Sequence, residues 1–161
     1  MSKINHIVSI LCLVVSVACQ PHPEIFRLEG DFTDEQVVLI ERAQEAWCNV
    51  GTQFGKSDSF CTELGEDGNS VFVAKDDLTK YYGTHQTISI NADEPQWGSR
   101  IILDNRLDPW LFYHVTKHEL GHHFCIKHTS NNGLMEPIAA DSDDSDITEE
   151  MITNGGCRVM R

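Results

Sequence analysis

Hydrophobic positions recur with helical spacing in the first third of the chain. Ile40, Ala43 and Trp47 lie at positions i, i+3 and i+7, which places their side chains along one face of a helix. Residues 33–36 have the composition of a capping box, in which side chains bind the free amide groups at a helix start. The pattern therefore predicts a helix that begins at residues 33–36 and ends near residues 48–51.

Between residues 51 and 105 the pattern changes to short apolar runs bounded by Gly, Asn, Asp and Pro. Such runs are typical of strands joined by turns. They comprise residues 70–74, 87–90 and 100–103. No internal repeat is visible among them.

Two further helices are predicted in the C-terminal part of the chain. Asp108 followed by Pro109 predicts an N-cap and a first helical residue. Asp146, with Glu149 three residues later, predicts the start of a closing helix, which stops at residues 154–156. Strands that lie between helices predict one α+β domain.

Length and composition fit a single globular domain that does not bind nucleic acid. The chain has 161 residues, of which 40% are hydrophobic, and this is enough for one core but too little for two full-sized domains. The formal net charge is −13, whereas binding to nucleic-acid phosphates requires clustered Lys and Arg. We expect a monomer without a nucleic-acid partner.

The first 18 residues have the features of a secretion signal. Lys3 gives a positive start, residues 7–17 are almost wholly apolar, and small residues at 16–18 form a cleavage site. The apolar run is too short to span a bilayer as a helix, which takes about 20 residues. We therefore expect residues 1–18 to be removed, with residues 19–31 as a tether to a domain at 32–161.

Cys19 directly follows the expected cleavage site, and this arrangement resembles a bacterial lipoprotein signal. The resemblance implies that Cys19 is acylated and becomes the first residue of an anchored protein. Ser16 departs from the Leu that such signals usually carry, so ordinary cleavage after Ala18 is the alternative. The protein is expected to be exported, either to the bacterial cell envelope as a lipoprotein or as a secreted protein, with membrane contact only through the lipid.

Four cysteines remain beyond the signal and the lipidation position. They form an even set in an oxidising compartment, which predicts two disulfides. Three connectivities are open, and we favour Cys48 with Cys61 and Cys125 with Cys157. Free buried thiols are the alternative.

The second predicted helix carries an H-E-x-x-H motif. His118 and His122 lie four residues apart, so on a helix they share one face and can bind one ion, with Glu119 beside them. A catalytic zinc site uses three protein ligands and leaves a fourth position for water. His128 is the candidate third ligand, whereas His123 points about 100° away on the helix and is expected to be a packed or exposed side chain.

Residues 118–128, followed by the turn at 133–137, resemble the HExxHxxGxxH pattern and Met-turn of the metzincin zinc peptidases, and among them the matrixins. The resemblance covers residues 111–152. It implies a metzincin-like domain, in which a small mixed β-sheet packs on the N-terminal helix and the active-site helix and the Met-turn and a C-terminal helix follow. In this domain His118, His122 and His128 hold one catalytic Zn²⁺, and Met135 forms a hydrophobic floor under the metal. Glu119 would be the catalytic base of a zinc-dependent endopeptidase, a hydrolase that cleaves peptide bonds through a zinc-activated water.

Two residues depart from the family pattern. Cys125 replaces the family glycine at a point where the backbone often takes a left-handed conformation, which costs a non-Gly residue roughly 1–2 kcal/mol. A disulfide to Cys157 could hold this turn, whereas a free thiolate could compete for the metal. Glu136 replaces a tyrosine that borders the pocket for the substrate side chain after the scissile bond. The family also implies an extended peptide substrate beside an edge strand, at residues 87–90 or 100–103.

Alternatives remain for the metals and for the activity. Residues 141–146 are rich in Asp and could supply oxygen ligands to structural Ca²⁺, although they lack EF-hand spacing and Asp146 fits a helix cap. The chain could also be a non-catalytic zinc-binding surface lipoprotein. In a third interpretation it is a gluzincin-like hydrolase, with Glu149 or Glu150 in place of His128.

Overall fold

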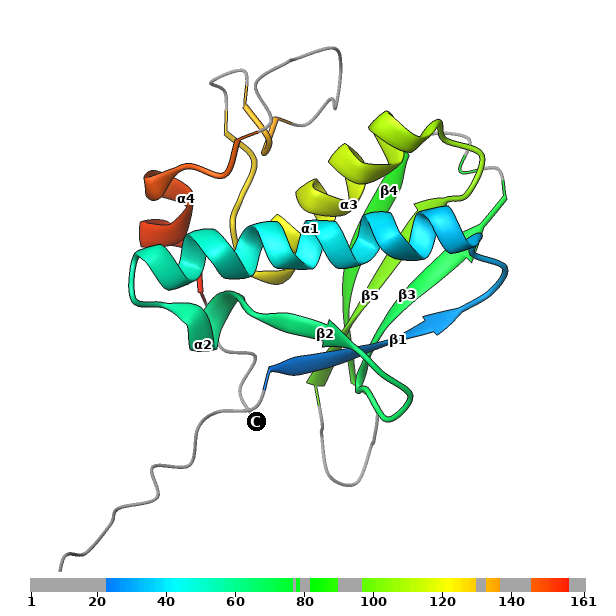
Figure 1. The fold of residues 1–161 in the computed structure, drawn as a ribbon, viewed down its shortest axis with the longest axis horizontal. Helices are drawn as coiled ribbons and strands as arrows, with labels where there is room; N and C mark the ends of the chain where they lie inside the picture. The colour runs from blue at the N-terminus through cyan, green and yellow to red at the C-terminus, as the bar shows by residue number, and fades with distance from the viewer. Residues whose placement is uncertain are drawn as a thin grey trace, which may run out of the picture.

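The computed structural model describes residues 23–76, 78, 82–89, 97–129, 133–136 and 146–156, and these form an α+β domain. A five-stranded sheet carries helices α1 and α3 on the same side (Figure 1). In chain order the elements are β1 (Glu24–Glu29), α1 (Asp34–Gln53), α2 (Ser57–Phe60), β2 (Thr62–Leu64), β3 (Ser70–Lys75), β4 (Gly83–Ser89), β5 (Trp97–Asp104), α3 (Pro109–His123) and α4 (Glu149–Asn154).

The sheet is mixed, as expected, and its strand order is β2-β1-β3-β5-β4. β1 pairs in parallel with β2 and with β3, and β3 pairs in parallel with β5. β4 runs antiparallel to β5 and lies at the edge of the sheet. This edge is next to α3, which packs against both β4 and β5. The topology therefore places one antiparallel edge strand beside the helix that carries the H-E-x-x-H motif.

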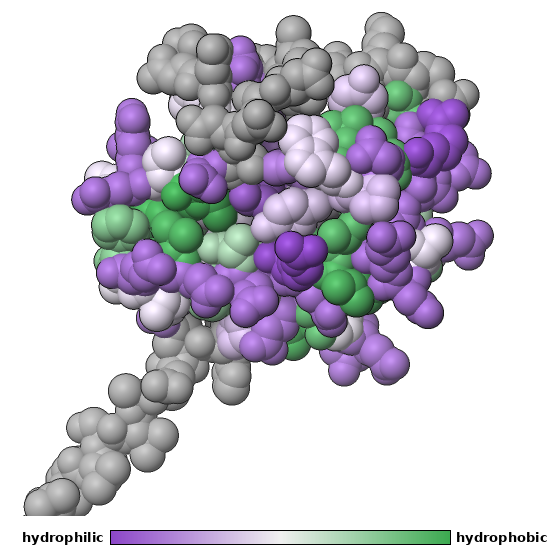
Figure 2. Space-filling view, turned by 45° about the horizontal axis from the view of Figure 1, so that its top comes forward, coloured by the Kyte–Doolittle hydropathy of each residue, from purple (hydrophilic) through white to green (hydrophobic). Residues whose placement is uncertain are grey.

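The core lies between the sheet and helices α1 and α3. Ile40, Ala43 and Trp47 are all buried, which confirms the predicted apolar face of the first helix. The indole ring of Trp47 stacks on Phe60, and both rings contact Phe124 just beyond α3. Apolar side chains also lie among hydrophilic ones on the outer surface (Figure 2), as is usual for a globular protein.

The helix starts follow from local sequence. Thr33 and Gln36 form the predicted capping box of α1, which extends two residues beyond the expected end, to Gln53. Asp108 caps α3 by accepting hydrogen bonds from the amides of Trp110 and Leu111. The predicted cap of the closing helix is wrong, because Thr148 and not Asp146 accepts the hydrogen bond from the amide of Met151. The helix ends at Asn154, as expected.

The expected tether contains a strand that the sequence analysis missed. Residues 24–29 form β1, which lies between β2 and β3 in the sheet. Only Phe26 is buried in this strand, so its sequence lacks the alternation by which a half-buried strand is recognised. The short elements α2 and β2 were also missed. The three predicted strands exist as parts of β3, β4 and β5, although Ile90, at the end of one predicted run, lies outside the described residues.

A disulfide joins Cys48 at the end of α1 to Cys61 after α2, as predicted. Cys125 is also disulfide-bonded, whereas Cys157, its expected partner, lies outside the described residues. The expected signal with Cys19, and residues 141–145 of the acidic segment, lie outside them as well. Among the described helices, none has the length and apolar character that a membrane span requires.

Candidate metal centre

Three histidines converge at the C-terminal end of α3. His118 and His122 lie one turn apart on the helix, and His128 follows in the segment beyond it. One nitrogen atom from each ring can be chosen so that all three atoms lie within 4.8 Å of one another. The structure therefore brings together the three side chains that the sequence analysis chose as ligands, and this group could hold a metal ion.

Hydrogen bonds to backbone carbonyls orient two of the imidazoles. Nδ1 of His118 donates to the carbonyl oxygen of Leu134 at 2.6 Å, and Nδ1 of His122 donates to that of Ile126 at 2.8 Å. Because a carbonyl oxygen only accepts, Nδ1 carries the proton in each ring and Nε2 keeps a free lone pair. This pattern is typical of metal-binding histidines, whose second nitrogen fixes the tautomer and the ring orientation.

The distance between His122 and His128 fits two ligands of one ion. Their Nε2 atoms lie 3.0 Å apart. Two nitrogens bound tetrahedrally to zinc at about 2.0–2.1 Å would lie roughly 3.3 Å apart. If the two rings moved apart by a few tenths of an ångström, both Nε2 atoms could therefore bind the same ion.

The chain reverses after α3 through a left-handed residue. The amide of Cys125 donates to the carbonyl of His122, and that of Ile126 donates to the carbonyl of Gly121, each at 2.9 Å. These two bonds form a Schellman motif, which usually has glycine at the left-handed position. Cys125 has φ +64°, and among the described non-glycine residues it alone has a positive φ. The expected left-handed conformation is therefore present, and it turns the chain so that His128 returns to the helix.

A turn at residues 133–136 supports the histidines from the other side. Its ends are held by hydrogen bonds from the amide of Glu136 to the carbonyl of Gly133 and from that of Thr129 to the carbonyl of Met135, both 2.9 Å. Met135 is fully buried and its sulfur packs against Gly121, between the two helical ligands in sequence. The predicted Met-turn is thus a turn that also supplies the carbonyl oxygen to His118.

The side chain of Glu119 lies on the face of α3 that packs against the edge strand β4. The edge strand comes close to this side chain, because a Cβ atom on Gly83 would lie 3.0 Å from its Cγ. Burial raises the pKa of Glu119 from 4.5 to about 7, although the nearby backbone amide of His85 opposes this. A carboxyl group with a pKa near neutrality can both accept and release a proton in that pH range.

Burial also favours the neutral form of the candidate ligands. It lowers the pKa of His118 from 6.5 to about 4, and it lowers the pKa of His122. Neutral imidazole is the form that binds a metal ion. The surroundings of both rings therefore reduce the competition between protons and a metal.

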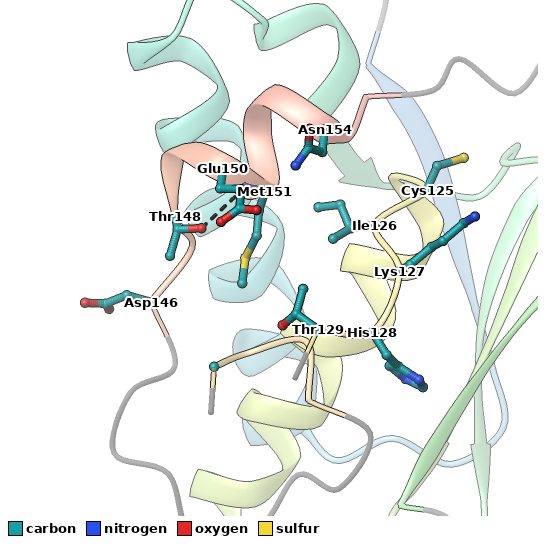
Figure 3. A pocket seen from close by; sticks show the side chains of 11 residues that line it. Cys125, Ile126, Lys127, His128, Thr129, Asp146, Thr148, Glu150, Met151 and Asn154 are labelled. Atoms are coloured by element: carbon teal, nitrogen blue, oxygen red, sulfur yellow. Dashed lines mark hydrogen bonds between the residues drawn. The ribbon is translucent and has the colours of Figure 1, made fainter. Parts of the chain in front are cut away.

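A cavity of about 330 Å³ lies beside the third histidine, between the segment that carries it and α4. Its lining includes Ile126, Thr129 and Met151, whereas the ring of His128 points away from it (Figure 3). Glu150 also borders this cavity. The metal-ligand group found among the described residues contains His128 and neither Glu149 nor Glu150, so the geometry favours the histidine as the third ligand.

Two other histidines lie near this centre. His123 is buried as a packed side chain, which is one of the two environments expected for it, and it contacts Ser99 and Glu24. His85 contacts Ser99 from β4. These partners lie far apart in sequence and share no motif, so only the sheet topology reveals them.

No protein-family model and no curated protein sequence matches the chain.

Proposed function

We propose that this chain is a zinc-dependent endopeptidase of the metzincin type, similar to the matrixins. The observation that carries the proposal is the convergence of three imidazoles, two of which donate Nδ1–H to backbone carbonyls and therefore have an unprotonated Nε2. The Met-turn and the left-handed turn between the second and third ligands support the metzincin assignment.

The donor set fits zinc better than magnesium or calcium. Imidazole nitrogen is a borderline-soft ligand that suits zinc, whereas magnesium and calcium prefer oxygen ligands. Three protein ligands leave a coordination position for water or substrate. When bound at His118, His122 and His128, zinc would supply Lewis-acid polarisation of the water and of the peptide carbonyl.

Glu119 acts as the general base and then as the general acid of the proposed reaction. It follows the first ligand directly and lies on the β4 side of the helix, sheltered from solvent. It accepts a proton from the water that attacks the peptide carbonyl and then delivers a proton to the leaving amine. Both steps require a single carboxyl group that is held in place and shielded from bulk water.

The edge strand is the proposed partner of an extended peptide substrate. Of the two candidate segments, residues 100–103 belong to β5, which already pairs with β3 on one side and β4 on the other. β4 lies at the sheet edge and contacts the helix that carries Glu119. A peptide added beside β4 would run past the candidate metal centre and be held by backbone hydrogen bonds.

The export and assembly proposals come from the sequence. An N-terminal signal with Cys19 at the cleavage point supports a protein secreted or anchored by lipid in a bacterial cell envelope. We propose a monomer whose partner is a peptide or protein substrate. The mass of the mature protein, recovered from an expressing bacterium, distinguishes acylated from unmodified Cys19.

Metal content and peptide cleavage, measured on the same samples of the mature protein, test the activity. We expect one zinc per chain and cleavage of a broad peptide library. Glu119→Ala should retain zinc and lose cleavage, whereas Glu149→Ala, which removes an exposed carboxylate on α4, should retain both. Cleavage that survives Glu119→Ala would refute the proposed role of Glu119. Zinc without any cleavage by the wild type would favour a non-catalytic zinc-binding protein.

A second comparison tests the ligand set. His128→Ala should lower bound zinc, whereas Glu149→Ala and Glu150→Ala should not, because only the histidine belongs to the convergent group. The opposite result would favour the gluzincin-like alternative.

A further inference from the structure

A chain of polar side chains crosses the sheet beneath α3. Glu24 of β1 bonds to the hydroxyl of Ser70 in β3, and that hydroxyl accepts a hydrogen bond from the amide of Ser99 in β5 at 2.8 Å. The hydroxyl of Ser99 lies 3.0 Å from Nε2 of His85 in β4. Four neighbouring strands of the sheet thus contribute one polar residue each, in the order β1, β3, β5 and β4.

His123 joins this chain to the helix. Its Nδ1 lies 2.7 Å from the hydroxyl of Ser99, and its Nε2 lies 3.2 Å from the carboxylate of Glu24. His123 directly follows the candidate ligand His122. The five residues Glu24, Ser70, Ser99, His85 and His123 are called the polar chain below.

The polar chain lies in the interior of the domain, where most side chains of a globular protein are apolar. Ser70, Ser99 and His123 are all buried, and burying a polar group without a partner costs several kcal/mol. Each of these three side chains has a hydrogen-bond partner within the polar chain. A fully satisfied buried network of this kind is rigid and fixes the relative positions of the elements that contribute to it.

One end of the polar chain reaches Glu119. The side chain of His85 is held by Ser99, while the backbone amide of the same residue lies near the carboxyl group of Glu119. Gly83, two residues earlier on the same strand, allows β4 to approach Glu119 closely. Movement of β4 relative to α3 would therefore change the position of the carboxyl group.

We infer that the polar chain is a positioning device that holds β4 against α3 and thereby fixes the Glu119 carboxyl group, which lies against β4. The inference rests on the proposed function for its catalytic consequence, but not for its structural content. Ser99 is the central member, because its hydroxyl contacts both histidines. Ser99 and Glu24 act through His85 and are positioning residues.

Ser99→Ala tests the inference, because it removes the central hydroxyl with little change in volume. We expect zinc content to stay at the wild-type value, KM for a peptide substrate to change less than about twofold, and kcat to fall about 10-fold to 100-fold, as is usual when the support of a metal site is removed. Thr116→Val is the matched control, since it removes a buried hydroxyl of α3 that bonds to the carbonyl of Phe112, outside the polar chain. It should leave kcat within about twofold.

A spectroscopic readout separates this inference from the proposed function. The amide proton of His85 reports on the position of the Glu119 carboxyl group, because its chemical shift depends on the distance to this nearby charged acceptor. Glu119→Gln should shift it upfield, and Ser99→Ala should shift it in the same direction, whereas Thr116→Val should leave it unchanged. If Ser99→Ala does not fold, Glu24→Ala and Glu24→Gln provide a second test. The side-chain amide of Glu24→Gln still accepts a hydrogen bond, so the His85 chemical shift should stay close to that of the wild type in Glu24→Gln and change in Glu24→Ala.

An unchanged His85 resonance in Ser99→Ala or Glu24→Ala would overturn the inference. So would a loss of kcat in Ser99→Ala no greater than that in Thr116→Val. If no variant and no wild-type sample cleaves peptides, the proposed function fails, but the His85 resonance still decides whether the polar chain positions Glu119.

Discussion

A Cβ atom placed on Gly121 would lie 2.3 Å from the sulfur of Met135. Gly121 lies in α3 between His118 and His122, and Met135 lies in the turn whose Leu134 carbonyl accepts the hydrogen bond from His118. The absence of a side chain at Gly121 therefore allows the turn to approach the helix closely enough to orient a candidate ligand.

Gly121→Ala is expected to destabilise the protein and to weaken metal binding. Alanine inside a helix normally stabilises it by roughly 0.5–1 kcal/mol relative to glycine, but a forced contact in a packed core costs about 1–3 kcal/mol. The contact would displace Met135 and, with it, the carbonyl that fixes His118. We expect zinc affinity to fall about 10-fold to 100-fold, as measured by competition with a chromogenic chelator, alongside urea denaturation of the metal-free protein.

Gly51→Ala is the control for this substitution. Gly51 lies in α1, outside the metal centre. A Cβ atom on Gly51 would lie 2.7 Å from Cβ of Phe60. This variant should also lose stability while its zinc affinity stays within about twofold of the wild type. Equal losses of zinc affinity in both variants would show that general destabilisation, and not the Met135 contact, controls metal binding.

Local chemistry explains which parts of the fold the sequence reveals. The caps at Thr33 and Asp108 depend on residues within one helical turn, so their composition identifies them directly. The spacing of His118 and His122 likewise needs only helical geometry. The return of His128 depends on a single turn, and its position six residues after His122 made it the candidate third ligand, with which the metzincin pattern agrees.

Long-range pairing explains what the sequence did not reveal. β1 has one buried residue, Phe26, and two prolines lie just before it at positions 21 and 23, so the segment looks like a linker. The contact between Glu24 and His123 joins residues from opposite ends of the domain. No local sequence pattern predicts such a pair, because the two residues meet only once the strands have paired and α3 has packed on the sheet.

Replacements of Cys125 should separate backbone strain from the effect of the disulfide. Cys125→Gly and Cys125→Ala both remove the cross-link, but only glycine adopts φ +64° without a steric cost. In a background that carries Cys157→Ser, we expect the glycine variant to be more stable than the alanine variant by about 1–2 kcal/mol. Urea denaturation of both proteins measures the difference in the free energy of unfolding.

Lys127 provides the matched control two residues later, because it is exposed and does not have a positive φ. There the glycine variant should be the less stable of the two, by about 0.4–1 kcal/mol, since glycine has more conformational freedom to lose on folding. An alanine variant at Cys125 as stable as the glycine variant would contradict the assignment of strain to this turn.

Asp104 should contribute stability that disappears in acid. Its carboxylate accepts hydrogen bonds from the side chain and amide of Arg106 and from the amide of Leu78. The hydrogen bond from the Arg106 side chain is the main cause that lowers the pKa of Asp104 from 3.8 to about 2. Because the folded pKa lies below the unfolded one, this stabilisation is complete above about pH 4 and is lost as the pH falls towards 2.

Asp104→Asn measures that contribution. We expect a loss of about 1–2 kcal/mol at pH 7, because charge-assisted hydrogen bonds are replaced by weaker ones. The difference from the wild type should shrink between pH 4 and pH 2 in urea denaturation. Asp67→Asn, in an exposed turn between β2 and β3, should change stability by less than about 0.5 kcal/mol. A difference at Asp104 that does not depend on pH would show that its charge is unimportant.

Removal of the metal should lower the thermal stability of the wild type and leave His118→Ala unaffected. A ligand that binds only the folded state stabilises it by about 2.7 kcal/mol at 100 times its Kd, and for a domain of this size each kcal/mol corresponds to about 2–4 °C in Tm. We therefore expect a strong chelator to lower Tm by roughly 5–10 °C and added zinc to restore it, as followed by circular dichroism. His114→Ala is the control, because this half-buried histidine lies one turn before His118, packs with its ring tilted against Trp110 and lies outside the convergent group. Its chelator-dependent shift should match that of the wild type, and a shift that persists in His118→Ala would mean that the metal binds elsewhere.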